Sequence, residues 1–136
     1  MAKKLSLPAV NIQYPWSELI LKGDKRIETR GYPIPKHYVG QDLLIIETPG
    51  MSKAGPSKAE VVGVVVFGEC FKYETKYDWL IDADEHLVPQ GHPIFGFSKN
   101  AEKWGWRVKS CRRLAKRQSA PTRKGIQFTK SVLVSL

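Results

Sequence analysis

At 136 residues, the chain is long enough for one domain with a hydrophobic core and too short for two. Its 42% hydrophobic and 26% charged residues are typical of globular domains, which excludes global disorder and a coiled coil. We therefore expect a single domain over residues 1–136, and its formal net charge of +9 points to a polyanionic partner.

The positive charge is concentrated in the last quarter of the chain. Residues 103–136 contain 10 Lys and Arg and no acidic residue, whereas residues 1–102 contain 12 Lys and Arg and all 13 Asp and Glu. Such a segment is typical of nucleic-acid binding, because each neutralised phosphate releases condensed counterions. A solvated basic loop is the alternative. The candidates for backbone contacts are Arg107, Lys109, Arg112, Arg113, Lys116, Arg117, Arg123 and Lys124.

The sequence predicts no metal site, no cofactor and no membrane partner. Cys70 and Cys111 are 41 residues apart, and neither has a second Cys or His at ligand spacing. No apolar run approaches the roughly 18 residues that a membrane helix needs. We expect a cytoplasmic or nuclear protein with reduced thiols.

In chain order, the first expected elements are a strand over residues 9–13 and a helix of about two turns. Pro15 suits the first helical position, and Gly23 suits the residue that follows the helix. The apolar stripe of this helix consists of Trp16, Leu19 and Ile20. Because so short a helix is unstable alone, the stripe must pack on the rest of the domain.

The segment from Lys25 to Arg30 predicts a turn followed by a short strand. Ile27 and Thr29 share one face of this strand, and the other face carries Arg26, Glu28 and Arg30. Lys25 can reach the charged face from the turn. Glu28 can neutralise one cation while another stays free for a phosphate or carbonyl oxygen, and Lys25 can act as a base if burial lowers its pKa. The alternative is a surface strand with weak ion pairs.

The rest of the chain predicts strands, loops and one further helix. Loops rich in Pro, Gly or basic residues are expected over residues 31–41, 49–58, 88–98 and 115–125. Strands are expected over residues 42–48, 60–72, 103–114 and 126–136. Residues 77–87 predict a helix, whose inward side chains would be Trp79, Leu80, Ala83 and Leu87.

Gly63 and Gly68 interrupt the longest apolar strand at positions where a strand bends or bulges, and such bends curl a sheet towards a barrel. Strands mixed with isolated helices favour an α+β fold. We expect a small β-barrel of five or six mixed strands with two or more short helices.

The segment PWSELILKGDKRIETR resembles the signature of the ASCH domain, a PUA-like β-barrel family. The family pattern G-x-K-x-x-E-x-R directly follows a helix that often begins with Pro-Trp, and its four positions are occupied here by Gly23, Lys25, Glu28 and Arg30. The segments GQDLLIIET, WGWRVKSCRRL and PTRKGIQF resemble later strands of the family, so the similarity covers nearly the whole chain.

This resemblance implies a cleft, lined by the motif residues, that holds a nucleic acid or a nucleotide. The similar PUA and YTH modules bind RNA or modified bases. Some small relatives are hydrolases. In a branch that acts on acetylated cytidine, the motif Lys works with a Thr nucleophile and a separate Glu, and this chain has Glu28 in place of that Thr. Other members are reported as ribonucleases.

Aromatic residues offer further candidates for the cleft. Trp104 and Trp106 share one face of the strand over 103–114, with Arg107 and Lys109 on the other, and they either stack on a base or belong to the core. Trp16 is either a core residue or a roof over the cleft. Ser17 is either a local hydrogen-bond partner or a cleft residue.

The acidic residues of the 77–87 helix do not have the spacing of a metal site. A solvated acidic helix face is the better interpretation for Asp82, Asp84, Glu85 and His86, with His92 nearby. Glu69, at a bend in the long strand, is expected at the sheet edge rather than in the cleft.

Together, these patterns predict a domain that binds RNA or single-stranded nucleic acid and holds one nucleotide in a cleft at the motif. The residues expected at the cleft are Trp16, Ser17, Lys25, Arg26, Glu28, Arg30, Trp104 and Trp106. The first alternative is a hydrolase of RNA or of a modified nucleoside, with Lys25 as base or electrostatic catalyst and Glu28 as its partner. The second is a protein-interaction module of a transcription or translation complex, whose basic face meets an acidic partner.

Overall fold

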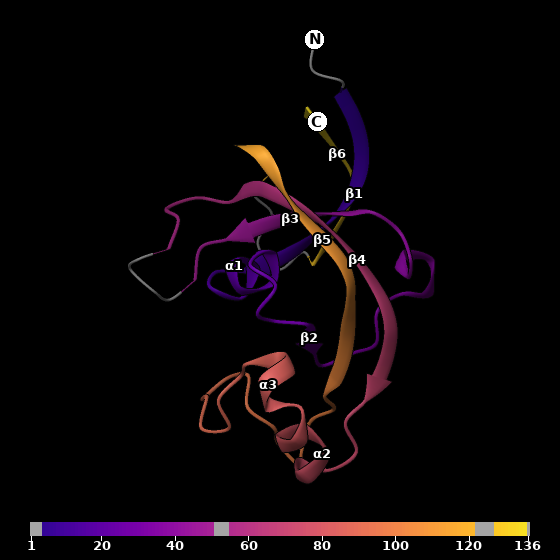
Figure 1. The fold of residues 1–136 in the computed structure, drawn as a ribbon, viewed down its shortest axis with the longest axis vertical. Coiled ribbons are helices and arrows are strands. Elements are labelled where there is room, and N and C mark those ends of the chain that lie inside the picture. Colours follow the sequence, from indigo (N-terminus) through magenta and orange to yellow (C-terminus); the bar gives the residue numbers. More distant parts are fainter. Residues whose placement is uncertain (1–3, 51–54, 122–126, 136) are drawn as a thin grey trace.

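The computed structural model describes residues 4–50, 55–121 and 127–135. Within them, the chain forms six strands, three short α-helices and one turn of 3-10 helix (Figure 1). The strands are β1 (Lys4–Gln13), β2 (Ile27–Arg30), β3 (Leu43–Thr48), β4 (Glu60–Lys72), β5 (Trp104–Ser119) and β6 (Phe128–Ser135). The helices are α1 (Trp16–Leu21), η1 (Lys36–Tyr38), α2 (Lys76–Ile81) and α3 (Ala83–His86).

All six strands belong to one mixed sheet in the order β2-β5-β4-β3-β1-β6. β1 and β3 are parallel, and the other neighbours are antiparallel. In Figure 1, β4 and β5 are the two long curved ribbons that run side by side, and α2 and α3 lie together at one end of the molecule. This arrangement confirms the predicted α+β fold.

Side chains link the two edges of the curled sheet, where no backbone ladder closes the barrel among the described residues. Near one end of the gap, Arg30 Nη2 donates to the carbonyl oxygen of Asn11 at 2.7 Å, and Nη1 donates to the side chain of Gln127. At the other end, the Gln118 amide bonds both the N–H and the carbonyl oxygen of Ser135 at 2.8 Å. The sheet is therefore barrel-like without being closed.

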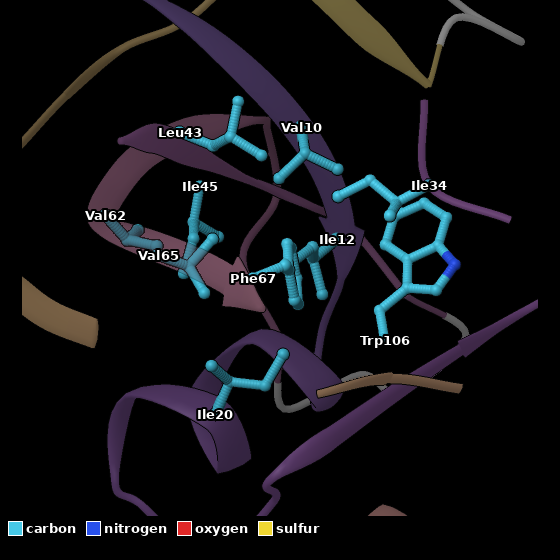
Figure 2. Close-up of a cluster of buried hydrophobic side chains, with 10 residues drawn as sticks. All are labelled: Val10, Ile12, Ile20, Ile34, Leu43, Ile45, Val62, Val65, Phe67 and Trp106. Carbon is cyan, nitrogen blue, oxygen red and sulfur yellow. The ribbon is translucent and has the colours of Figure 1, made fainter. Parts of the chain in front are cut away.

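The largest hydrophobic cluster fills the inside of the curled sheet (Figure 2). In this view, Ile20 of α1 points towards side chains from β1, β3 and β4, and Trp106 of β5 lies at one side of the group. α1 packs this closely because Gly63 of β4 has no side chain: a Cβ there would lie 2.6 Å from the Leu21 side chain. The short helix is thus held by tertiary packing, as its length requires.

Two predicted boundaries at the start of the chain are wrong. β1 begins at Lys4 instead of residue 9. Pro8 is tolerated because the ladder with β6 shifts register around it, and the ladder with β3 begins only at Ala9. Pro15 is the N-cap residue of α1 and follows a cis peptide bond, whereas the sequence analysis placed it inside the helix.

Two later boundaries are also wrong. The predicted helix over 77–87 is two helices that meet at Asp82, and Leu80, expected to face inward, is 44% exposed. β5 continues to Ser119, so part of the predicted basic loop over 115–125 is strand, where it pairs with the start of β4. The rest of that loop falls largely on residues 122–126, outside the described residues.

Candidate nucleotide-binding cleft

A tight turn after α1 brings Lys25 back against the helix. Gly23 has a φ of +84°, in the left-handed region that glycine adopts without strain. The N–H groups of Asp24 and Lys25 both donate to the carbonyl oxygen of Leu19 at 3.0 Å. As a result, the Lys25 ammonium group lies 5.1 Å from the centre of the Trp16 ring. The Gly and Lys of the motif therefore act together to place one cation beneath an aromatic ring.

Lys25 is buried, with only 1% of its surface exposed. Its Nζ donates to the carbonyl oxygen of His86 and lies 3.8 Å from Glu28 Oε1. Burial lowers the pKa of Lys25 to about 8, because desolvation disfavours the ammonium form more than the Glu28 carboxylate favours it. A lysine with such a pKa supplies both its charged and its neutral form near physiological pH.

Glu28 and Arg30 form a buried ion pair on β2. Glu28 Oε2 accepts from Arg30 Nη2 at 3.0 Å and from Nε at 3.3 Å, and Glu28 is 5% exposed. The Arg30 guanidinium also lies 5.3 Å from the centre of the Trp106 ring. Since Arg30 also bonds Asn11 and Gln127, it is largely engaged within the protein. Glu28 therefore pairs more closely with Arg30, at 3.0 Å, than with Lys25, at 3.8 Å.

Arg26 was predicted to share the charged face with Glu28 and Arg30, and this prediction is wrong. It precedes β2, is exposed, and forms an ion pair with Glu85 at 2.7 Å. Its backbone carbonyl instead accepts from the N–H of Val108 at 2.8 Å. The alternation that was assumed for residues 26–30 holds only from Ile27, where the strand begins.

A cleft of about 990 Å³ opens over Lys25, Glu28 and Arg30. Trp16 and Phe95 form an aromatic wall, with their rings edge to face and 6.0 Å between centroids. Other described parts of the lining come from β1, β3, residues 57–59 and residues 101–103. The cleft therefore gathers segments that are distant in sequence around the three charged motif residues.

Lys103 is a cleft residue that the sequence analysis missed. Its Nζ donates to the carbonyl oxygen of Phe95 at 3.0 Å and lies 5.3 Å from the centre of the Trp79 ring. Burial lowers the pKa of Lys103 as well. Strand alternation would place it on the outer face with Arg107 and Lys109. Because β5 begins only at Trp104, no local signal in the sequence reveals its position.

The other two tryptophan candidates lie behind the cleft rather than in its wall. Trp106 is completely buried in the core cluster of Figure 2, and its Nε1 donates to the carbonyl oxygen of Tyr32 at 3.0 Å. Trp104 is partly buried against the same cluster. Neither lines the cleft, so the structure favours the core interpretation of this pair.

Ser17 is also buried away from the cleft. Its Oγ donates to Glu47 Oε2 at 2.7 Å, and the other oxygen of this buried carboxylate accepts from Arg117. Arg117 also donates to Glu60 at 3.1 Å. Glu47 was not singled out from the sequence, although its place in the alternation with Leu43 and Ile45 marks it as an inward-facing acid.

The basic residues of β5 fall into two groups. Arg113 bonds both carboxylate oxygens of Glu18 at 2.9 Å, and Arg117 is paired as described. Lys109, Arg112 and Lys116 are exposed, and none of them forms an ion pair within the described part of the chain.

Arg107 is exposed and lies 5.4 Å from the centre of the Phe71 ring. Arg123 and Lys124 lie outside the described residues.

His86 was predicted to lie on a solvated helix face, and this prediction is wrong. It is completely buried, and its ring stacks on Trp79 with 3.7 Å between centroids. Nε2 lies 2.9 Å from the carbonyl oxygen of Trp79, and Nδ1 accepts from the N–H of Val88, which makes Nε2 the donor. Burial lowers the pKa of His86. The neutral ring thus anchors the backbone whose carbonyl holds Lys25.

The remaining acidic candidates lie outside the cleft. Asp82 accepts from the hydroxyl of Tyr73 at 2.7 Å, and Glu69 is exposed. In the part of the chain that the structure describes, no three His, Cys, Asp or Glu side chains are grouped closely enough to hold a metal ion. No described helix is long and apolar enough to cross a membrane.

The curled mixed sheet and the cleft at its G-x-K-x-x-E-x-R segment define the class of protein. A model of the ASCH domain matches residues 10–118, and the chain belongs to the ASCH domain family. This finding confirms the resemblance seen in the sequence. No curated protein matches the chain.

Crystal structures of an ASCH protein from Zymomonas mobilis share the fold. One structure is of that ASCH protein, with a TM-score of 0.66, and two are of its single-residue variants, with TM-scores of 0.65 and 0.67. Each match has 11% sequence identity and covers 90% of this chain and 85 to 88% of that protein. At this identity, the likeness concerns the fold alone.

Proposed function

We propose that this ASCH domain binds RNA or another single-stranded nucleic acid and accommodates one nucleotide in the cleft at its motif. The family is generally thought to bind RNA. The observation that carries the proposal is the cleft itself. Its volume of about 990 Å³ suits a small organic ligand, and it combines an aromatic wall with a buried cation.

The aromatic wall supports recognition of a base. Trp16 and Phe95 both line the cleft and are only partly buried, so ring surface remains for a ligand. Stacking of a base on an aromatic side chain is typically worth about 1 to 3 kcal/mol. The Lys25 ammonium supplies hydrogen-bond donors on the same side of the cleft as Trp16.

The outer surface of β5 supports contacts with the phosphate backbone. Lys109, Arg112 and Lys116 are exposed and not engaged by a carboxylate of the described residues, so they keep their full charge for phosphates. Such contacts hold a strand without reading its sequence. Arg113 and Arg117 contribute less to this surface, because Glu18, Glu47 and Glu60 neutralise them.

A hydrolase is the second candidate, and the lowered pKa of Lys25 favours it. General bases work best when their pKa lies near the working pH, and burial brings the pKa of Lys25 to about 8. Glu28 is an ion-pair partner of Lys25, with its Oε1 3.8 Å from the Lys25 Nζ. In this reading Lys25 takes a proton from water or from a hydroxyl of the substrate.

One experiment separates the two candidates. Fluorescence anisotropy with labelled single-stranded RNA and DNA measures binding, and gel analysis of the same samples, together with acetylated cytidine, measures turnover. A binding domain retains its ligand unchanged, and Lys25→Met weakens the complex about tenfold, the value expected for one lost charged hydrogen bond. The exposed Lys36→Met variant removes the same charge elsewhere and is the control.

An enzyme instead releases product, and Lys25→Met abolishes turnover while leaving most of the affinity for the strand intact. If neither complex nor product forms with any of these ligands, the proposed function is wrong, and an interaction with an acidic protein becomes the better explanation of the basic surface.

A further inference from the structure

The described lining of the cleft contains more cations than carboxylates. Its cationic side chains are Lys25, Arg30, Lys58 and Lys103, and its carboxylates are Glu28 and Glu102. Glu28 is engaged mainly by Arg30, at 3.0 Å, and Glu102 forms an ion pair with Lys72 at 3.2 Å. Lys25 and Lys103 therefore have no carboxylate of their own, apart from the 3.8 Å approach of Glu28 to Lys25.

The two lysines are placed on the aromatic wall. Lys25 Nζ lies 5.1 Å from the centre of the Trp16 ring, and Lys103 Nζ donates to the carbonyl oxygen of Phe95 at 3.0 Å. Because Trp16 and Phe95 contact each other edge to face, one ammonium group lies beside each member of the pair. Both ammonium groups therefore lie close to the same aromatic pair, and Lys103 is near enough to Lys25 to help lower its pKa.

Each ammonium group retains donors for a ligand. An ammonium has three N–H donors. His86 accepts a hydrogen bond from Lys25, whose Nζ also lies 3.8 Å from Glu28 Oε1, and Phe95 accepts one from Lys103. Burial of a cation without an equal opposite charge costs free energy, as the lowered pKa values of both lysines show. An anion in the cleft would remove that cost.

We propose that Lys25 and Lys103 bind a phosphate group, so that the cleft selects nucleotides that carry a phosphate over neutral nucleosides. The ligand class is a nucleoside monophosphate, free or at the end of a strand. A phosphomonoester carries about 1.5 to 2 negative charges at pH 7 and three acceptor oxygens, which matches two ammonium groups. This inference rests on the proposed function, because it assumes that a nucleotide enters this cleft.

A pH dependence follows from the surroundings of Lys25. The charged groups near it are Glu28, Arg30 and Lys103, and the neutral His86 contributes its carbonyl oxygen. A bound phosphate favours the ammonium form and raises the pKa of Lys25 above its free value of about 8. Binding therefore takes up a proton above that pH, and affinity for the phosphate falls up to about tenfold for each further pH unit.

Isothermal titration calorimetry with 5′-AMP, 3′-AMP, adenosine and inorganic phosphate tests the assignment. We expect either monophosphate to bind at least tenfold more tightly than adenosine, and Lys103→Met to lose about tenfold of that preference. Lys103→Arg should restore most of it. Lys36→Met, which removes an exposed lysine outside the cleft, should change nothing. Inorganic phosphate should compete with both monophosphates.

Adenosine binding as tightly as the monophosphates, or a Lys103→Met variant that binds them like the wild-type protein, would overturn the phosphate assignment and leave the proposed function standing. If oligonucleotides, nucleotides and adenosine all fail to bind, the proposed function itself fails. If strands bind but no mononucleotide does, the phosphate site is wrong and recognition rests on the β5 surface.

Discussion

The burial of Lys25 lowers the pKa of its side chain and thereby makes the stability of the domain depend on pH. The turn at Gly23 and the carbonyl oxygen of His86 hold its ammonium group in a largely dry position. Since the pKa of Lys25 is about 8 in the folded protein and about 10.4 in an unfolded chain, the unfolded state binds more protons between these values. Stability should therefore rise with pH across this window.

The first prediction compares wild type with Lys25→Met in chemical denaturation at several pH values. Between pH 7 and pH 10, the difference in the free energy of unfolding should shift by about 2 to 3 kcal/mol in favour of the wild type, as its ammonium group loses its proton. The comparison cancels the titration of other groups. If this difference stays constant between pH 7 and pH 10, burial does not lower the pKa of Lys25 in the folded protein.

At the residue level, the sequence predicted the motif better than its surroundings. Lys25, Glu28 and Arg30 line one cleft, as the resemblance to the ASCH family implied, and their role in binding stays a prediction. Arg26 was misplaced and Lys103 was missed for the same reason. Each precedes the first residue of its strand, where alternation no longer decides which way a side chain points.

Elements in this domain depend on close contacts at particular glycines. Both Gly63 and Gly68 were predicted to bend β4, and the ladders of β4 do shift register near both. Their surroundings differ. A Cβ on Gly63 would lie 2.6 Å from Leu21 and 2.7 Å from the backbone oxygen of Arg112, whereas the nearest atom to a Cβ on Gly68 is 3.7 Å away.

The second prediction is that Gly63→Ala destabilises the protein by about 1 to 3 kcal/mol, because α1 and β5 must move away from β4. Gly68→Ala, the matched control in the same strand, should change stability by less than about 0.5 kcal/mol. Urea denaturation of the two variants measures both values. Equal effects at the two positions would mean that α1 does not pack on β4 as described.

The third prediction concerns the outer surface of β5. Replacing Lys109, Arg112 and Lys116 together by Gln should lower affinity for single strands of any sequence. It should also reduce the slope of log K against log salt by about 2, since each lost phosphate contact removes about 0.7.

The control is the triple replacement of Lys4, Lys36 and Lys130, which are also exposed and lie on other elements. It removes the same net charge and should leave the slope nearly unchanged. Identical slopes for the two triple variants would mean that net charge, and not β5, attracts the strand.

Strand content was easier to predict than helix ends. The apolar composition of β3 and β4 predicts both as strands, and both lie within one or two residues of their predicted ranges. The break between α2 and α3 was missed because Asp82 interrupts the helix without a Gly or Pro.

At the level of the whole molecule, side chains connect the two edges of the curled sheet. No sequence pattern reveals such links, because Arg30, Gln118 and their partners are distant along the chain. Gln118 replaces a backbone ladder at one end of the gap by bonding both polar groups of Ser135.

The fourth prediction is that Gln118→Ala lowers the free energy of unfolding by about 1 to 3 kcal/mol, since it removes two hydrogen bonds. Hydrogen exchange should become faster at β6 and stay unchanged in β4, which pairs elsewhere. Gln41→Ala, at an exposed position between η1 and β3, is the control. Uniformly faster exchange, or none, would contradict the role of Gln118 in joining the edges.

The most direct test of the account is a two-dimensional amide NMR titration with a short single-stranded RNA. We predict the largest shift changes along Gly23–Tyr32 and residues 101–103, together with the indole N–H of Trp16, because these groups line or frame the cleft. Smaller changes should follow β5. Changes restricted to β5, with the cleft signals unmoved at saturation, would contradict the claim that the motif cleft receives a nucleotide.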